Sequence, residues 1–282
     1  MSDEYTWTSP DNRIKKKTLR SGVFGTKPTE NTICTIEITY VKWESEPIQT
    51  EYVAKRSHYP LSINIGEANT ALDREVEKCP QTMHLDELSS FAICFEDCEL
   101  SFVLKLCHFE SRGYIYEWDA KDKCLIAQRH KEKGVELFQK RRYIDASHRF
   151  SRGLKLLLSI PIPVDEALTE VDGVNVSELA NFKKKLYNNL ASCYTRNKSY
   201  DTVIDLCTKV LEIDKTNVNA FYKRGVAYAG IRNFEKSKED LETVLAMDNE
   251  NKVAKEKLQY VMTNIQKQEA NYACMVKKMF GK

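Results

Sequence analysis

The chain has 282 residues, of which 42% are hydrophobic and 30% are charged, and its formal net charge is +2. This hydrophobic content excludes a wholly disordered chain, and the length is sufficient for two domains of ordinary size. No stretch approaches the ~18–20 apolar residues that a membrane helix needs, and the acidic start Met1-Ser2-Asp3-Glu4 does not resemble a signal peptide. None of the nine cysteines forms a Cys-x-x-Cys pair, which favours reduced thiols in the cytoplasm or the nucleus.

The small net charge hides a difference between the two halves of the chain. Residues 1–126 contain 15 Lys and Arg and 21 Asp and Glu, a balance of −6. Residues 127–282 contain 28 and 20, a balance of +8. Such an asymmetry favours two modules that have different partners.

The first half has the pattern of strands around one helix. Alternating and β-branched side chains predict strands at Thr32–Val41, Leu61–Ile65, Phe91–Phe95 and Leu100–Leu106. Leu72 and Val76, four residues apart, predict a short helix over about residues 70–79. We therefore expect an N-terminal tail at 1–12, a β-sheet and helix domain at 13–112, and a linker at 113–126 in which a long helix begins.

The second half repeats itself with a period of 34 residues. Tyr187–Tyr194 aligns with Phe221–Tyr228, and Thr208–Asp214 aligns with Glu242–Asp248 at the same offset of 34. A third unit precedes them, but its Gly134 lies 57 positions before Ala191, so about 23 residues are inserted. We place this insert at about 161–177, where prolines, acidic residues and an Asp-Gly pair are typical of a loop.

The period and its small residues resemble the tetratricopeptide repeat (TPR), over residues 127–249. Gly134, Ala191 and Gly225 occupy the position where paired helices touch. The resemblance implies an all-α superhelix of three repeats. A capping helix and tail should follow at 250–282, with an apolar stripe formed by Val253, Leu258, Val261, Met262 and Ile265. This segment is either a plain solubilising cap or a partner-binding tail that acts through Tyr272, Met275, Met279 and Phe280.

The resemblance extends to co-chaperone TPR domains, whose groove binds the C-terminal carboxylates of heat-shock proteins 70 and 90. It implies five clamp positions, which in this chain are Lys131, Val135, Asn189, Asn219 and Lys223. Lys131 and Asn189 match the family, Lys223 replaces Arg, and Val135 and Asn219 replace Asn and Lys. Each lost contact costs ~1–3 kcal/mol of binding. The alternative interpretation of Lys131 and Lys223 is that they are solvated surface lysines.

The first half resembles the FKBP-type immunophilins, in the order of Ile14–Lys17, Cys34–Ile38, Leu61–Gly66 and Leu100–Glu110 ahead of the repeats. That family implies a prolyl isomerase pocket with a Trp floor, and here Leu72 stands at the Trp position and Ile38 at a Tyr position. The family's Phe-Asp pair has no counterpart in Glu46–Tyr59. Its long loop before the last strand is missing, because Phe95 is followed within five residues by Leu100. We therefore expect neither isomerase activity nor macrolide binding.

The two halves together are similar to the FKBP-like protein (FKBPL) family of co-chaperone adaptors. The segments that carry this likeness are Leu156–Pro163, Lys223–Ala227 and Lys277–Gly281. The resemblance implies a non-enzymatic α+β multidomain adaptor that docks a heat-shock protein tail and contacts a client through its first half. Two alternatives stay open, a TPR scaffold for partners unrelated to chaperones and a weak prolyl isomerase.

Other chemistry has little support in the sequence. Cys94 and Cys98 have no nearby His to complete a metal site, and no glycine pattern predicts a phosphate-binding loop. We therefore expect no cofactor, no metal and no membrane partner. The basic runs Lys15–Lys17, Lys140–Arg142 and Lys183–Lys185 lack interleaved aromatics. We interpret them as solvated helix faces and expect no nucleic acid partner.

Overall fold

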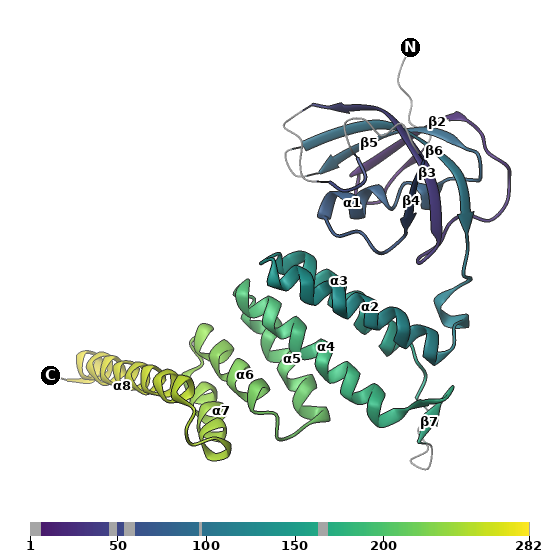
Figure 1. The fold of residues 1–282 in the computed structure, drawn as a ribbon. Coiled ribbons are helices and arrows are strands. Elements are labelled where there is room, and N and C mark those ends of the chain that lie inside the picture. Colours follow the sequence, from purple (N-terminus) through teal and green to yellow (C-terminus); the bar gives the residue numbers. More distant parts are fainter. Residues whose placement is uncertain (1–6, 45–49, 54–59, 96–97, 163–168, 282) are drawn as a thin grey trace. The chain divides into compact units, whose positions relative to one another are not determined.

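The computed structural model describes residues 7–44, 50–53, 60–95, 98–162 and 169–281 (Figure 1). The chain divides into two compact units, one ending at Trp118 and one beginning at Asp119, and each is described by itself. Within the described ranges, none of the helices has the length and apolar character needed to cross a bilayer.

The first unit is built on a six-stranded antiparallel sheet in the order β1-β2-β5-β6-β3-β4. Its strands are β1 (Trp7–Thr8), β2 (Ile14–Arg20), β3 (Ile33–Trp43), β4 (Leu61–Asn64), β5 (Leu88–Phe95) and β6 (Cys98–Glu110). Its helical elements are α1 (Ala71–Val76) and the 3-10 turns η1 (Pro80–Thr82) and η2 (Ile115–Glu117). All four predicted strands are present, and α1 is shorter than the predicted helix.

The sheet packs one face against α1 to form an apolar core. Phe91 and Phe102 are directly opposite in the β5–β6 register, and their ring centroids lie 5.9 Å apart. Leu72 and Val76 of α1 are fully buried in the same cluster. Successive side chains of a strand point to opposite faces. The alternating apolar residues Cys34, Ile36 and Ile38 of β3 therefore lie on the face that forms this core.

β2 escaped prediction because a lysine occupies an inward-facing position. Lys16 lies two residues after the buried Ile14 and is itself 6% exposed. Its ammonium pairs with Glu87 Oε1 at 2.6 Å. The interpretation of Lys15–Lys17 as a solvated helix face is therefore wrong. The run Lys140–Arg142 lies at the turn after α2 (Ala120–Gln139) rather than on a helix face.

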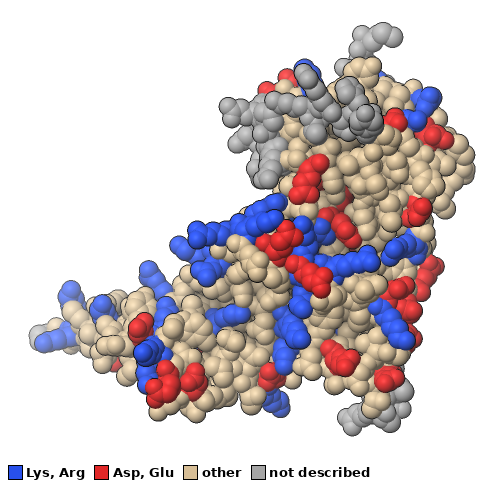
Figure 2. Space-filling view, viewed as in Figure 1, with Lys and Arg blue, Asp and Glu red and all other residues tan. Residues whose placement is uncertain are grey.

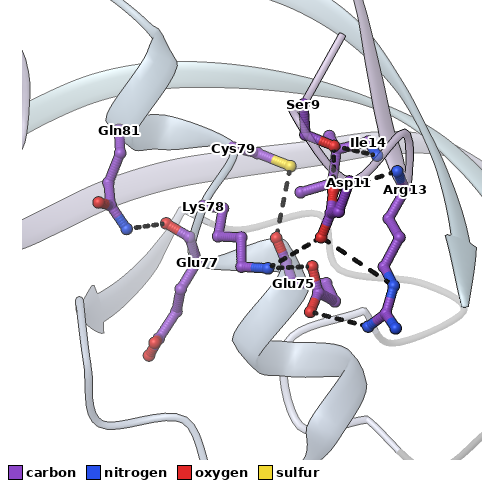
Figure 3. A network of polar contacts seen from close by, with 9 residues as sticks. All are labelled: Ser9, Asp11, Arg13, Ile14, Glu75, Glu77, Lys78, Cys79 and Gln81. Carbon is purple, nitrogen blue, oxygen red and sulfur yellow. Dashed lines mark hydrogen bonds and ion pairs between the residues drawn. The ribbon is translucent and has the colours of Figure 1, made fainter.

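Residues 7–12 belong to the sheet unit and not to a tail. β1 pairs with Lys15 and Lys16 of β2, and the turn between β1 and β2 is tied to the end of α1 (Figure 3). Asp11 lies 3.9 Å from the Lys78 ammonium, and Arg13 lies 3.9 Å from Glu75. Ser9 accepts a hydrogen bond from the Ile14 backbone at 2.9 Å. A search for apolar periodicity in the sequence cannot detect these polar contacts.

The second unit is a series of antiparallel helix pairs, each packed on the next along the chain. Its helices are α2 (Ala120–Gln139), α3 (Tyr143–Leu158), α4 (Val176–Arg196), α5 (Tyr200–Ile213), α6 (Val218–Gly230), α7 (Phe234–Met247) and α8 (Lys252–Phe280). The pairs α2–α3, α4–α5 and α6–α7 are the three predicted repeats. The predicted insert contains a small hairpin of β7 (Glu170–Val171) and β8 (Val174–Asn175), and it ends at Asn175, which caps α4.

The small residues hold the helix pairs together as predicted. A Cβ atom at Gly134 would lie 2.5 Å from the Phe150 ring, so the ring or the helix would have to shift to admit it. At Gly225 the corresponding contact is 3.1 Å from Leu241 Cγ, and Ala191 is fully buried. Close approach of paired helices therefore depends most strongly on Gly134.

α8 caps the last repeat through a stripe that differs in part from the predicted one. Ala254 and Val261 are fully buried, and Leu258 and Ile265 pack against the apolar cluster that contains Val261. The predicted members Val253 and Met262 are instead 57% and 44% exposed. The spacing of four, three and four residues from position 254 to 265 places those four on one face, beside the two exposed residues.

Candidate functional site

The five predicted clamp positions all lie on the first helix of a repeat. Lys131 and Val135 are one turn apart on α2, Asn189 is on α4, and Asn219 and Lys223 are on α6. Val135 and Asn189 line one cavity of about 220 Å³, together with Ser192, Phe150 and two further α2 residues. Two of the five positions therefore face a common hollow between α2 and α4.

Lys223 reaches from α6 to α4 and is held there by two hydrogen bonds. Its ammonium donates to the Asn188 carbonyl at 3.1 Å and to Ser192 Oγ at 2.8 Å. Ser192 in turn donates to the Asn188 carbonyl at 2.9 Å. Burial lowers the pKa of Lys223 from its ordinary value. The alternative that Lys223 is a solvated surface lysine is wrong, because its charge is fixed next to Ser192 of the cavity.

The Lys223 ammonium keeps donor capacity for a ligand. A lysine ammonium has three N–H donors, and the contacts with Asn188 and Ser192 use two of them. Arg224, the next residue, points to a different partner: its guanidinium binds Asp240 of α7 through two bonds of 2.9 and 2.8 Å. Those hydrogen bonds raise the pKa of Arg224, so this cation serves the packing of α6 on α7.

Lys131 lies in a neighbouring cavity of about 510 Å³ between α2 and α4. Its ammonium is 5.8 Å from the centroid of the Phe182 ring, within cation–π range. Lys184 and Lys185 line the same cavity, whereas Glu178 is its acidic member. Lys184 is already paired with Asp214 at 3.1 Å. The cavity therefore offers Lys131 and Lys185 to an acidic ligand.

Asn219 differs from Lys131, Val135 and Asn189, which line a cavity, and from Lys223, which is hydrogen-bonded to Ser192 at the edge of one. It is exposed in the first turn of α6 and lines neither of these two cavities. Ser192 and Phe182 were not singled out in the sequence, although both line cavities with clamp residues. Ser192 could have been found, since it follows Asn189 by three residues and so shares its helix face.

Basic side chains are spread widely over the face of the helical unit seen in Figure 2, with acidic side chains between them. The +8 balance of residues 127–282 is therefore not gathered into one patch on that face. Lys131 and Lys185 line one cavity, and Lys223 is hydrogen-bonded to Ser192 of the other, so these three lysines place part of the charge at the two cavities.

Leu72 and Ile38, the two residues that the sequence places at pocket positions, belong to the core of the sheet unit. Leu72 is 1% exposed and Ile38 is 5% exposed, and both belong to one cluster with Val53. Asp73, beside Leu72, accepts hydrogen bonds from the Glu51 and Tyr52 amides at 2.8 and 3.2 Å. Most of Glu46–Tyr59, where no Phe-Asp pair was found, lies outside the described residues. β5 ends at Phe95 and β6 begins at Cys98, so no long loop separates these strands.

Both units match models of known protein families. A family model described as BDBT FKBP-like N-terminal matches residues 7–111. A model described as Bride of doubletime-like, TPR domain, matches residues 119–205, and one for the tetratricopeptide repeat matches residues 218–251. The chain is an FKBP-like TPR protein. The resemblance drawn from the sequence is thereby confirmed.

This chain is similar to mammalian proteins that are named FK506-binding protein-like. FK506-binding protein-like of Mus musculus is 31% identical over 222 residues, which are 78% of this chain and 59% of the mouse protein. The Homo sapiens protein of that name is 28% identical over 278 residues, 98% of this chain and 72% of the human protein. The chain thus spans 59% of the mouse relative's length. Peptidyl-prolyl cis-trans isomerase FKBP4 of Homo sapiens is also similar, with 26% identity over 184 residues, which are 65% of this chain and 38% of that protein.

The fold is shared with a solved structure. The crystal structure of residues 1–211 of CG17282 superposes with a TM-score of 0.59 at 24% sequence identity. The match covers 69% of this FKBP-like TPR protein and 95% of that chain. At this identity the match establishes the fold alone.

Proposed function

We propose that this FKBP-like TPR protein is a non-enzymatic co-chaperone adaptor whose groove binds the acidic C-terminal peptide of heat-shock protein 90 or 70. The observation that carries the proposal is the placement of Lys223, whose ammonium is fixed beside the cavity that Val135 and Asn189 line. A terminal Asp presents two carboxylates, and charge-assisted hydrogen bonds bind carboxylates best. Asn189, Lys131 and Lys223 supply an amide and two cations for them.

The fixed position of Lys223 offsets part of what the other clamp positions lost. A lysine that is already held by Asn188 and Ser192 has little side-chain freedom left to lose on binding. The side chain of Val135 has no hydrogen-bond donor, and that of Asn219 donates without charge. Against these losses, Lys185 adds a cation near Lys131. The groove therefore favours an acidic peptide with weaker or altered selectivity.

Fluorescence anisotropy with a labelled peptide ending in Met-Glu-Glu-Val-Asp tests this proposal. Lys223→Ala and Lys131→Ala should each raise Kd by roughly 5- to 150-fold, because each removes a charge-assisted contact worth ~1–3 kcal/mol. Lys238→Ala is the matched control, since Lys238 forms a 3.9 Å surface pair with Glu242 on α7 and lines neither cavity. Saturable binding that is equal in all four proteins would contradict the proposed site.

We propose further that the sheet domain has no prolyl isomerase activity. Ile38 and Leu72 are aliphatic and buried, so neither presents an aromatic surface to a proline. A protease-coupled assay on a proline peptide should show the uncatalysed rate. Turnover above that rate, lost in Leu72→Ala, would instead establish the alternative of a weak isomerase.

A TPR scaffold for partners unrelated to chaperones is the second candidate, and Val135 and Asn219 favour it. A pull-down repeated with an excess of free chaperone-tail peptide separates the two. Loss of captured heat-shock protein in the presence of the peptide supports the adaptor, whereas a partner that stays bound supports the scaffold. The adaptor proposal also includes two further points. The protein resides in the cytoplasm or the nucleus, and its sheet domain contacts a client.

A further inference from the structure

A second site lies in the sheet domain, in a cavity of about 650 Å³. Residues of β1, β2, the loop at 21–27 and the segment at 81–87 line it. The aromatic and ionisable side chains of this lining are Trp7, Lys16, Phe24, Lys27, His84 and Glu87. Neither Leu72 nor Ile38 lines this cavity, so it is distinct from the pocket positions discussed above. Its volume is in the range of ordinary ligand sites.

The floor of the cavity is an ion pair. Lys16 and Glu87 have side chains that are 7% and 4% exposed, with Nζ and Oε1 2.6 Å apart. The Lys16 ammonium also donates to the Thr82 carbonyl at 2.8 Å. The charges of Lys16 and Glu87 cancel each other, so the floor is polar but close to neutral.

Lys27 adds a positive charge at the mouth of the cavity. Its ammonium donates to the same Thr82 carbonyl at 3.0 Å, and the side chain is exposed. A carbonyl is neutral, and no ion pair of Lys27 occurs among the described residues. Two of its three N–H donors are left for a ligand. This is a suitable partner for a carboxylate.

The rim carries two aromatic side chains on a backbone that is held in place. Phe24 is 93% exposed, and its ring centroid lies 5.6 Å from that of His84. Trp7, from β1, is 37% exposed. The Val23 amide donates to the Leu85 carbonyl at 2.7 Å, and a Cβ at Gly22 would lie 2.2 Å from that carbonyl. The loop is thus bound closely to the segment at 83–87, with Phe24 beside the cavity.

We propose that this cavity binds an acidic peptide segment of a partner protein, in which a carboxylate lies next to an aromatic side chain. The carboxylate would pair with Lys27, and the aromatic ring would lie against Phe24 and Trp7. Charge complementarity and the exposed rings both favour this occupant, because aromatic residues are enriched at the centres of protein interfaces. The proposal does not depend on the TPR groove, which belongs to the other unit.

Selection of a random peptide library on the full chain tests the proposal. Peptides displayed at the N-terminus of a phage coat protein have no free carboxyl terminus, and an excess of free Met-Glu-Glu-Val-Asp peptide occupies the TPR groove. We expect enrichment of peptides that place Asp or Glu beside Phe, Tyr or Trp. Failure to enrich such peptides would overturn the proposal.

Variants then locate the site of the selected peptides. Lys27→Glu should raise Kd about tenfold or more, and Phe24→Ala about fivefold or more. Lys42→Glu is the matched charge reversal, because Lys42 is exposed on β3 and does not line the cavity. Both test residues are exposed, and an unchanged circular dichroism spectrum would show that the variants fold. Equal Kd values for wild type and Lys27→Glu would overturn the proposal. So would binding of a ten-nucleotide oligothymidine that depends on Lys27 and is tighter than binding of the selected peptides.

Discussion

Val135 is the position at which the clamp can be repaired most directly, by the substitution Val135→Asn. Val135 lines a cavity with Asn189, and its side chain is 37% exposed. An asparagine amide there can donate to a peptide carboxylate, and such a bond to a charged group is worth ~1.5–3 kcal/mol. We therefore predict a Kd roughly 10- to 150-fold lower for a peptide ending in Met-Glu-Glu-Val-Asp.

The substitution has a modest cost in stability. Full burial of a valine contributes ~1.5–3 kcal/mol, and Val135 is only partly buried, so we expect a loss of ~1–2 kcal/mol in the free energy of unfolding. Isothermal titration calorimetry measures the affinity, and urea unfolding measures the stability. Val135→Ala is the control, since it removes the same apolar contact without adding a donor.

Two outcomes of this experiment would refute the reasoning. A folded Val135→Asn protein with the wild-type Kd would show that position 135 does not face the bound carboxylates. An equal gain in Val135→Ala would show that space, and not a hydrogen bond, limits binding. The gain should also disappear with a peptide whose C-terminus is amidated.

The remaining predictions concern stability. Gly134→Ala should lower the free energy of unfolding by ~1–3 kcal/mol, because its Cβ would lie 2.5 Å from Phe150; thermal unfolding should show a smaller loss for Gly225→Ala, and the reverse order would disprove the contact argument. Leu72→Ala should cost ~2–5 kcal/mol since Leu72 is 1% exposed, whereas the half-exposed Leu19→Ala should cost little; a small cost at Leu72 would reveal an open pocket. Burial and the nearby Arg149 lower the pKa of His130 to about 3, so protonation of His130 favours the unfolded chain. The free energy of unfolding should therefore be highest above pH ~6.5 and should fall by up to ~1.4 kcal/mol per pH unit as the pH is lowered to about 3. Urea unfolding of His130→Gln between pH 7 and 4 should give a flatter profile, and a profile parallel to the wild type would rule out His130 as the cause.

The repeat architecture could be predicted because it rests on local and periodic features. Small residues at Gly134, Ala191 and Gly225 recur where helices touch, and each is buried as expected. The sheet was predictable wherever one face is apolar, as at β3 and β5. β2 was missed because Lys16 occupies an inward position, and its burial depends on Glu87, 71 residues later in the chain. Periodicity carries no information about such a partner.

The side-chain contacts at the candidate site could not be predicted from the sequence. The resemblance to co-chaperone TPR domains implies a clamp role for Lys223, yet only the structure shows that Asn188 and Ser192 hold its ammonium. The sequence also does not show that the neighbouring Arg224 binds Asp240 of α7. For α8, two adjacent apolar residues, Val261 and Met262, were both assigned to the stripe, although only Val261 is buried.

The central claim is that the groove recognises a terminal carboxylate, and one calorimetric titration tests it most directly. The wild-type chain is titrated with a peptide ending in Met-Glu-Glu-Val-Asp as the free acid, and again with the same peptide amidated at its C-terminus. The account predicts saturable binding of the free acid and a loss of roughly tenfold or more in affinity for the amide. Equal affinity for the two peptides, or binding of neither, would contradict it.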